Sequence, residues 1–363
     1  MTRCALLFAL AFVACKSRSS TAPAIVVKQD ATAVDAQTDH SLVSTVQRLR
    51  AEKKLPALAA AAWVDGKLVE DVAVGLRKAN DPTHPVTTSD RWHLGSNTKA
   101  MTAMLVGIYV DRGTLHWDDT LGKLFEKVHA GYANVTLAQL LRHNSGASQD
   151  PPPKLWEHLA AGTPSDARGK FVRDILGAKP PHAATKFEYS NTNYMIAGVV
   201  LERATKKSWE DLMRDELFTP LGMTSCGFGA PGSAAVDQPW GHNASGPIEP
   251  GPAADNPPGL GPAGTVHCSL ADYGKFLVLF TGHGPPIVKP ETLAQMLVPN
   301  ADGYAAGWLV AGKLLVHNGS NTLWMMSAAV SPAAKRVLVL ATNTADMTLE
   351  NNLLATFLTY TPP

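Results

Sequence analysis

Segments with the composition of β-strands lie at both ends of this 363-residue chain, and helical patterns fill its middle. Near the start, apolar runs over 57–64 and 67–75 flank Asp65-Gly66, a dipeptide typical of a tight hairpin turn. Three more strand-like runs lie near the other end, over 307–317, 323–330 and 335–343. We therefore expect an α/β (α+β) fold in which both chain ends contribute to one antiparallel sheet.

The middle of the chain is predicted to form a helical lobe, inserted between about residues 111 and 261. Helical patterns cover 100–111, 136–143, 191–204 and 208–217, and a terminal helix is expected over 347–360. The Pro- and Gly-rich segment 229–264 is predicted to be a long loop, and loops of that length in compact domains are usually functional or mobile. Residues 39–363 are expected to form one domain, which begins with a helix capped by Asp39 or Ser41.

The first fifteen residues have the pattern of an export signal. Arg3 supplies a positive charge, and the apolar stretch over 4–14 is too short to span a bilayer. The run Phe12-Val13-Ala14-Cys15 resembles a bacterial lipoprotein signal, in which Cys15 becomes the lipidated N-terminus. An ordinary secretory signal that contains a cysteine is the alternative. With residues 16–38 as a flexible tether, the pattern predicts an exported protein of the periplasm or cell envelope, held at the membrane by a lipid anchor.

Charge and cysteine content limit the function classes. The chain has 32 Lys and Arg against 31 Asp and Glu, and this net charge of +1 argues against a basic protein that binds nucleic acid. The sequence contains neither a Cys-x-x-Cys pair nor a His-Glu-x-x-His motif, so we expect no metal site of those common zinc types. Cys226 and Cys268 either form a disulfide or lie apart as small buried residues, and the sequence leaves both open.

Ser96 and Lys99 are the strongest candidates for a catalytic pair. They lie at the head of a helical pattern, where residues three apart share one face with Cβ atoms about 5–6 Å apart. A serine hydroxyl is a poor nucleophile until a neighbouring group takes its proton, and a lysine whose pKa is lowered by burial can take it. Taken alone, the pair is also compatible with a serine N-cap beside a solvated lysine.

A Tyr-x-Asn motif at Tyr189 and Asn191 supplies a candidate proton relay. A phenol near an ammonium group loses its proton more readily and can pass protons between a serine and a leaving group. The amide of Asn191 can bind a substrate carbonyl or hold the lysine in place. A second copy of the motif, at 132–134, is expected to lie in a loop before a helix.

A His-x-Gly motif at His317 and Gly319 ends a predicted strand. Glycine on a strand permits close approach of a ligand, and the N–H of Ser320 can then form an oxyanion hole with the N–H of Ser96. The strand context favours His317 over two other copies of the motif, at 93–95 and 129–131. His143 is expected to be structural and to close a helix.

In this order and spacing, the three motifs resemble those of the penicillin-recognising serine hydrolases, which include class C β-lactamases, DD-peptidases and related esterases. Flanking segments are also similar to the family, at 140–146, 220–224 and 262–269, so the resemblance covers roughly residues 42–343. It implies a β-lactamase/transpeptidase-like fold and no metal or organic cofactor. It also implies roles for the matching residues: Ser96 as acylated nucleophile, Lys99 as base, Tyr189 as proton shuttle, Asn191 and His317 as substrate contacts, and Ser320 as oxyanion donor.

One departure from the family pattern bears on the substrate. Position 317 is His where many members have Lys, and a histidine is mostly neutral near pH 7. The absence of a fixed cation weakens the case for a dedicated β-lactamase. We expect a serine hydrolase that acts through an acyl-enzyme on an ester, a D-amino peptide or a β-lactam-type amide. A catalytically inactive binding protein of the same fold is the alternative.

Overall fold

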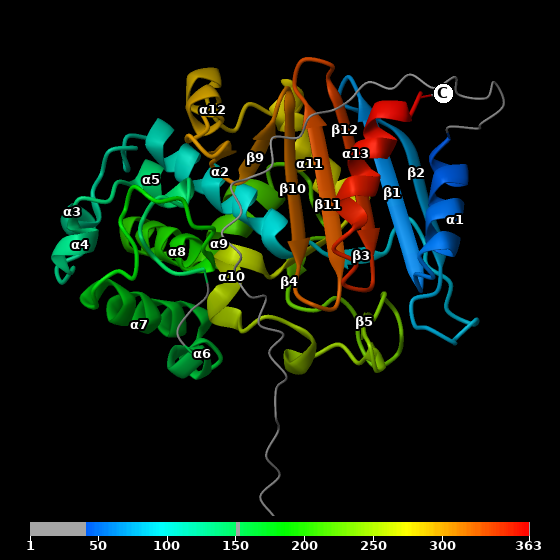
Figure 1. Ribbon diagram of the computed structural model, residues 1–363, viewed down its shortest axis with the longest axis horizontal. Helices are drawn as coiled ribbons and strands as arrows, with labels where there is room; N and C mark the ends of the chain where they lie inside the picture. The colour runs from blue at the N-terminus through cyan, green and yellow to red at the C-terminus, as the bar shows by residue number, and fades with distance from the viewer. Residues whose placement is uncertain (1–40, 150–152, 363) are drawn as a thin grey trace, which may run out of the picture. The chain divides into compact units, whose positions relative to one another are not determined.

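Seven strands form one antiparallel sheet in the computed structural model, which describes residues 41–149 and 153–362 (Figure 1). The strand order is β2-β1-β12-β11-β10-β9-β8. Their bounds are β1 Ala57–Val64, β2 Lys67–Gly75, β8 Tyr304–Ala305, β9 Trp308–Ala311, β10 Leu314–Ser320, β11 Met325–Ser331 and β12 Arg336–Thr342. Strand β1 pairs with β12, with Leu58 opposite Thr342, so the prediction of one sheet built from both chain ends is confirmed. The predicted signal, the tether and Cys15 lie outside the described residues.

The prediction of a single strand over 307–317 is wrong. The segment forms two strands, β9 and β10, which pair with each other across a tight turn. Gly312 lies in that turn with φ of +62°, a conformation that glycine adopts without steric cost. The apolar residues on both sides of Gly312 gave the segment the appearance of one continuous strand. Strand β10 extends beyond the predicted end at residue 317, so it contains the whole of the His317-to-Ser320 motif.

Strand β1 shows how helices cover both faces of the sheet. Its even-numbered residues from 58 to 62 pack with helices α1 (Leu42–Glu52) and α13 (Leu349–Thr359) in one apolar cluster. Its odd-numbered residues pack on the opposite face against α11 (Leu270–Leu277), in a second apolar cluster that also contains α2 (Thr98–Asp111). Successive side chains of a strand point to opposite faces, so this alternation places the sheet between two helical layers.

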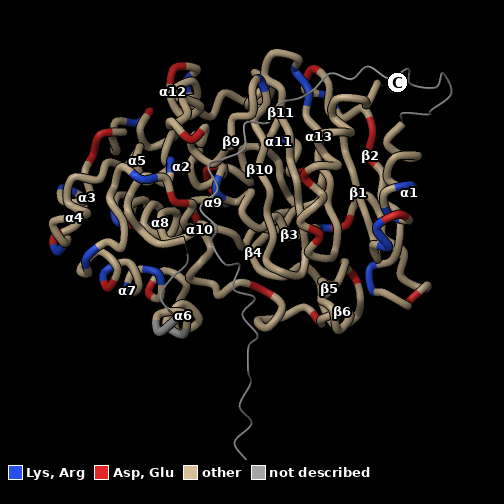
Figure 2. The backbone as a smooth tube through the Cα atoms, in the orientation of Figure 1, with Lys and Arg blue, Asp and Glu red and all other residues tan. Residues whose placement is uncertain are grey.

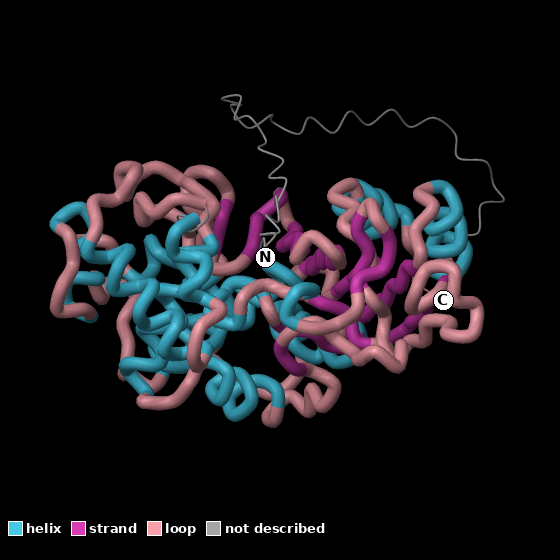
Figure 3. The backbone as a smooth tube through the Cα atoms, turned by 90° about the horizontal axis from the view of Figure 1, so that it is seen from below, coloured by secondary structure: helices cyan, strands magenta, loops and turns pink. Residues whose placement is uncertain are grey.

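The remaining helices group to one side of the sheet (Figures 1 and 3). They are α3 Leu121–Leu124, α4 Ala130–Ala133, α5 Leu137–Leu141, α6 Pro153–Leu159, α7 Pro164–Gly177, α8 Asn191–Thr205, α9 Trp209–Met213, α10 Gly261–Gly264 and α12 Pro290–Met296. The predicted helix over 208–217 is α9 continued by a π turn at Arg214–Phe218. Helix α7 was not predicted, although Thr163 caps it and Pro164 starts it. Helix α2 is buried continuously from residue 98 to 109, so it forms the centre of this packing.

A second, three-stranded sheet leads directly into the candidate site. It has the order β3-β7-β4, with β3 Arg91–His93, β7 Val266–Ser269 and β4 Gly227–Phe228. A disulfide joins Cys268, which lies in β7, to Cys226, which immediately precedes β4, and this decides between the two alternatives that the sequence left open. The disulfide closes a loop that contains the whole of the Pro- and Gly-rich segment 229–264. That segment is not entirely irregular, because it includes the short hairpin β5 (Gly241–Asn243) and β6 (Gly246–Ile248).

Charged residues of both signs are interspersed along the chain, while strands β10 and β11 carry none (Figure 2). Within residues 41–149 and 153–362, no helix is both long and apolar enough to cross a bilayer. The same residues contain no group of three or more His, Cys, Asp or Glu side chains arranged to hold a metal ion.

Candidate active site

Ser96 lies in a tight turn between strand β3 and helix α2. The turn is a short 3-10 helix over Gly95–Asn97, and Gly95 enters it with φ of +50°. Strand β10 passes immediately alongside, because a Cβ on Gly95 would collide with the backbone of Ser320 and a Cβ on Gly319 would collide with the backbone of Leu94. The two glycines therefore allow the backbone of the nucleophile turn to contact the backbone of β10.

Lys99 is fully buried and makes three hydrogen bonds at the base of the site. Its Nζ lies 2.9 Å from Ser96 Oγ, 2.8 Å from Asn191 Oδ1 and 2.8 Å from the carbonyl oxygen of Ala263. The last two partners are oxygens that can only accept. A neutral lysine that donates its two N–H groups to them would direct its lone pair at Ser96 Oγ. The geometry is therefore suited to removing the serine proton.

Tyr189 lies beside this pair, in the segment that leads into helix α8. The centroid of its ring is 4.9 Å from Lys99 Nζ. Asn191, the first residue of α8, is held by a hydrogen bond from its backbone N–H to the carbonyl oxygen of Gln149. The structure thus brings the predicted Tyr-x-Asn motif to the Ser-x-x-Lys motif, and it places the Asn191 amide on the lysine.

His317 lies on β10 with both ring nitrogens in hydrogen bonds. Nδ1 is 2.7 Å from the carbonyl oxygen of Asn318, which can only accept, so Nδ1 carries the proton. Nε2 must then accept from the hydroxyl of Tyr304, 2.9 Å away. Burial, together with the nearby charge of Lys99, lowers the pKa of His317 from 6.5 to about 3. The ring is therefore neutral at physiological pH and is committed to internal contacts.

A cavity of about 450 Å³ opens above Ser96. Its lining residues are Ser96, Phe187, Tyr189, Tyr304, Leu309, Val316, His317, Asn318, Gly319, Ser320, Met347 and Glu350. Five of the seven predicted site residues line it, while Lys99 and Asn191 are connected to Ser96 through hydrogen bonds. A second hollow of about 680 Å³, lined by Lys53, His242 and Asp346 among others, contains none of the predicted residues.

His143 has a positioning role that the sequence did not reveal. Its carbonyl oxygen accepts from the backbone N–H of Glu188, and its Nδ1 accepts from the backbone N–H of Ser190. These two residues flank Tyr189, whose ring packs 4.5 Å from the imidazole between centroids. Burial lowers the pKa of His143 far below its usual value, so the ring stays neutral and Nδ1 remains an acceptor. The contact depends on residues about 45 positions apart, so no local signal could have shown it.

His93 is a second missed positioning residue. Its Nδ1 accepts from the backbone N–H of Gly95 at 3.0 Å, and its Nε2 lies 2.8 Å from Asp255 Oδ1. The carboxylate thus fixes the proton on Nε2 and leaves Nδ1 free to hold the nucleophile turn. The side chain of His93 is fully buried. Asp255 comes from the Pro- and Gly-rich segment, so part of that segment supports the site directly.

The carbonyl oxygen that Lys99 contacts is also held in place. Thr102, one turn after Lys99, donates from Oγ1 to the carbonyl oxygen of Pro262 at 2.8 Å. Trp209 Nε1 donates to the same Thr102 hydroxyl at 3.1 Å. Pro262 immediately precedes Ala263, so this chain of hydrogen bonds from α9 fixes the backbone that faces the lysine.

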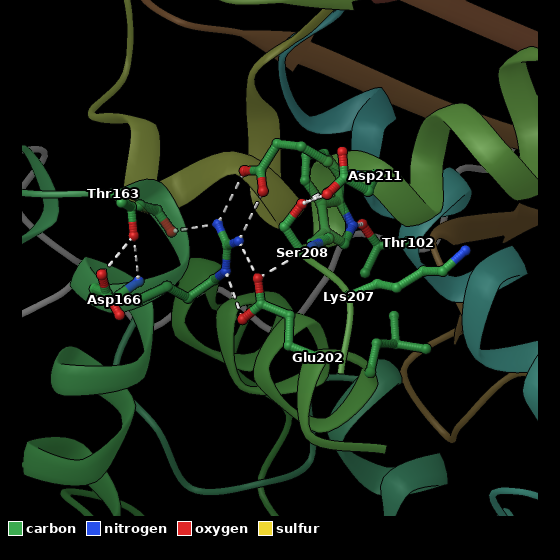
Figure 4. Close-up of polar contacts among 12 residues, drawn as sticks. Thr102, Thr163, Asp166, Glu202, Lys207, Ser208 and Asp211 are labelled. Atoms are coloured by element: carbon green, nitrogen blue, oxygen red, sulfur yellow. Dashed lines mark hydrogen bonds and ion pairs between the residues drawn. The ribbon is translucent and has the colours of Figure 1, made fainter. Parts of the chain in front are cut away.

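A buried ion network lies behind this chain. Arg168 on α7 is fully buried and pairs with Glu202 on α8 and with Glu210 on α9, the latter at 3.1 Å. Figure 4 shows Glu202 and Thr102 within this group of polar contacts. Burial opposes the charge of Arg168, but the two carboxylates outweigh it and hold the pKa of the guanidinium above its ordinary value. The network joins three helices that support the lysine side of the site.

Comparisons with known proteins agree with this geometry at the level of family and fold. The family model described as Beta-lactamase matches residues 42–359. Penicillin-binding protein 4 of Amycolatopsis lactamdurans is 36% identical over 182 residues, which cover 48% of this chain and 45% of the relative. The unguisins hydrolase ungD′ of Aspergillus campestris is 25% identical over 314 residues, covering 79% of this chain and 56% of the relative. The chain thus spans about half the length of these curated relatives.

Solved structures of similar proteins share the fold of this chain. The octameric penicillin-binding protein homologue from Pyrococcus abyssi superposes with a TM-score of 0.72 at 25% identity, covering 89% of this chain and 78% of that one. The β-lactamase/D-alanine carboxypeptidase from Pseudomonas syringae superposes with a TM-score of 0.74 at 17% identity, covering 88% and 98%, which shows the shared fold. The predicted β-lactamase/transpeptidase-like fold is confirmed. The chain belongs to the beta-lactamase family, a family of serine hydrolases.

Proposed function

We propose that this protein hydrolyses an ester or amide through an acyl-enzyme on Ser96. The observation that carries the proposal is the position of Lys99 Nζ, 2.9 Å from Ser96 Oγ and bonded to two acceptor oxygens. In the neutral lysine these two oxygens would take both N–H groups and direct the lone pair at the serine. Lys99 is therefore the proposed base for acylation.

The reaction would proceed in two halves. Lys99 takes the Ser96 proton as Oγ attacks the carbonyl carbon, and the N–H groups of Ser96 and Ser320 stabilise the negative oxygen. Tyr189 delivers a proton to the leaving group as its bond to the acyl carbon breaks. Lys99 passes the serine proton on to Tyr189, which restores both groups. A water molecule then attacks the acyl carbon, and its proton passes through the same relay to Ser96 Oγ as the acyl–Oγ bond breaks and the acid leaves. The close approach of β10 to the nucleophile turn supports the assignment of the two N–H groups.

The first test is covalent labelling. Intact mass should show a single adduct after incubation with a serine-directed fluorophosphonate, and Ser96→Ala should show none. Circular dichroism of Ser96→Ala serves as the control for folding. Without an adduct on the wild type, the proposal fails and an inactive binding protein of the same fold becomes the better description. With an adduct, panels of esters, D-amino peptides and β-lactams would define the substrate class.

We also propose that the chain is exported and tethered through a lipid on Cys15. The disulfide between Cys226 and Cys268 supports export, because disulfides persist in oxidising compartments. Metabolic labelling with a palmitate analogue tests the anchor. The label should appear in the wild type and be lost in Cys15→Ser, and equal labelling of both would contradict the lipid assignment.

A further inference from the structure

The cavity above Ser96 has an unusual charge composition. Among the described residues that line it, Glu350 is the one with a charged side chain, and none is Lys or Arg. Glu350 lies in the first turn of α13, and strands β10 and β11 below it carry no charged residue. Lys99 lies beneath the serine and does not line the cavity, and as the proposed base it is neutral when the substrate is attacked, so it adds no positive charge there.

His317 cannot supply the missing positive charge. Its Nδ1 proton is directed to the carbonyl oxygen of Asn318, and its Nε2 accepts from Tyr304. A substrate carboxylate would need a donor from this ring, and the one donor it has is already in use. Protonating Nε2 would break the contact with the Tyr304 hydroxyl or force that hydroxyl to rotate. The ring thus contributes a neutral surface to the cavity.

A leaving group released from Ser96 would depart into this cavity. Tyr189, the proposed proton donor to that group, lines the cavity together with His317. The other walls are apolar side chains, among them Leu309 and Met347, and Met347 is 65% exposed at the rim. A departing group would therefore contact apolar side chains, neutral hydrogen-bonding groups and one carboxylate. Desolvating a substrate carboxylate there would be unfavourable, since no cationic side chain lines the cavity to compensate it.

We propose that the leaving-group side of this cavity rejects substrates whose departing group carries a carboxylate, and favours a neutral or amine-bearing departing group, with Glu350 as the selecting residue. This inference rests on the proposed function, because it concerns the same Ser96 acylation. It narrows the substrate class to esters and amides without a free carboxylate next to the scissile bond. A cationic group gains attraction from Glu350, and an anionic group suffers repulsion.

Three matched aryl phosphonate esters can test the selection. They share one phosphonyl group and differ in a meta substituent on the departing phenol: aminomethyl, carboxamide or carboxylate. Every reagent leaves the same adduct on Ser96, so intact mass gives comparable second-order rates. Each rate is divided by the reagent's own rate with hydroxide, which removes intrinsic reactivity. We expect the order aminomethyl, carboxamide, carboxylate, with a total span of about tenfold, since a partly exposed charge contributes about threefold in each direction.

Two variants at position 350 make the test specific. Glu350→Gln should reduce the span between the charged reagents, and Glu350→Lys should reverse their order. Glu126→Gln removes an acidic residue that follows α3 by two positions and does not line the cavity, and it should keep the wild-type span. Helix α3 lies well apart from β10 in Figure 1. Equal rates for the three reagents, or a faster carboxylate reagent on the wild type, would overturn the charge selection while the adduct still supports a serine hydrolase. Absence of any adduct would overturn the proposed function and this inference with it.

Discussion

Removing the disulfide should destabilise the protein by about 4 kcal/mol. Cys226 and Cys268 are separated by 42 positions. In the chain-entropy model, cross-linking a loop of that length removes about 13 cal/mol/K from the unfolded state, which is about 4 kcal/mol at 25 °C. The double variant Cys226→Ala/Cys268→Ala should therefore unfold at a clearly lower urea concentration than the oxidised wild type. Cys268 is fully buried, so alanine there also leaves a small cavity that adds to the loss.

Urea unfolding followed by tryptophan fluorescence measures this difference, with and without dithiothreitol. Reductant should lower the stability of the wild type towards that of the double variant and should not affect the double variant itself. Peptide mapping of the oxidised protein must show the peptides of Cys226 and Cys268 joined. A double variant within about 1 kcal/mol of the oxidised wild type would refute the entropic reasoning. The reasoning would also be refuted if the wild type had the same urea midpoint with and without dithiothreitol.

Three further results are expected. Lys99→Ala should lower kcat/KM by about 10²–10⁴-fold, because it removes the proposed proton acceptor; a loss under tenfold in a folded variant would contradict that role. Arg168→Met should cost about 3 kcal/mol in urea unfolding, because it leaves two largely buried carboxylates without their cation, and adding Glu202→Gln should restore part of the loss; a change below about 1 kcal/mol would argue against the network. The pKa of His317 is about 3 in the folded protein and about 6.5 when unfolded, so below pH 6.5 the unfolded state binds more protons and stability falls as the pH drops. Between pH 7 and pH 5 this residue alone should cost about 2 kcal/mol, and the stability of His317→Gln should fall less over that range; identical pH profiles of the two proteins would show that His317 does not contribute.

Local patterns predicted much of the fold. The hairpin of β1 and β2 was found with its exact bounds, because Asp65-Gly66 marks the turn between two apolar runs. Helix α7 was overlooked even though Thr163 and Pro164 are ordinary start signals, since its apolar positions were not recognised in a segment rich in charge. The division of 307–317 into two strands depends on one glycine conformation, which composition alone does not reveal.

The candidate site was predictable where it depends on spacing and less so where it depends on tertiary contacts. Ser96 and Lys99 share a helical face, so three positions along the chain suffice to place them together. The carbonyl oxygen of Ala263 comes from a distant backbone segment, and any residue type could provide it. The hydrogen bonds between His143 and the residues that flank Tyr189 also involve main-chain groups, which have no sequence signature.

The pairing of β1 with β12 has a consequence for how the chain acquires its structure. During synthesis, β1 emerges early, but the strand that completes its pairing is among the last segments to appear. The central strands of the sheet cannot be assembled until nearly the whole polypeptide is available, and non-local pairing of this kind folds slowly. The nascent chain would therefore remain largely unfolded on the ribosome, with apolar strands accessible to chaperones. Such a delay is compatible with passage through a translocation channel as an extended polypeptide.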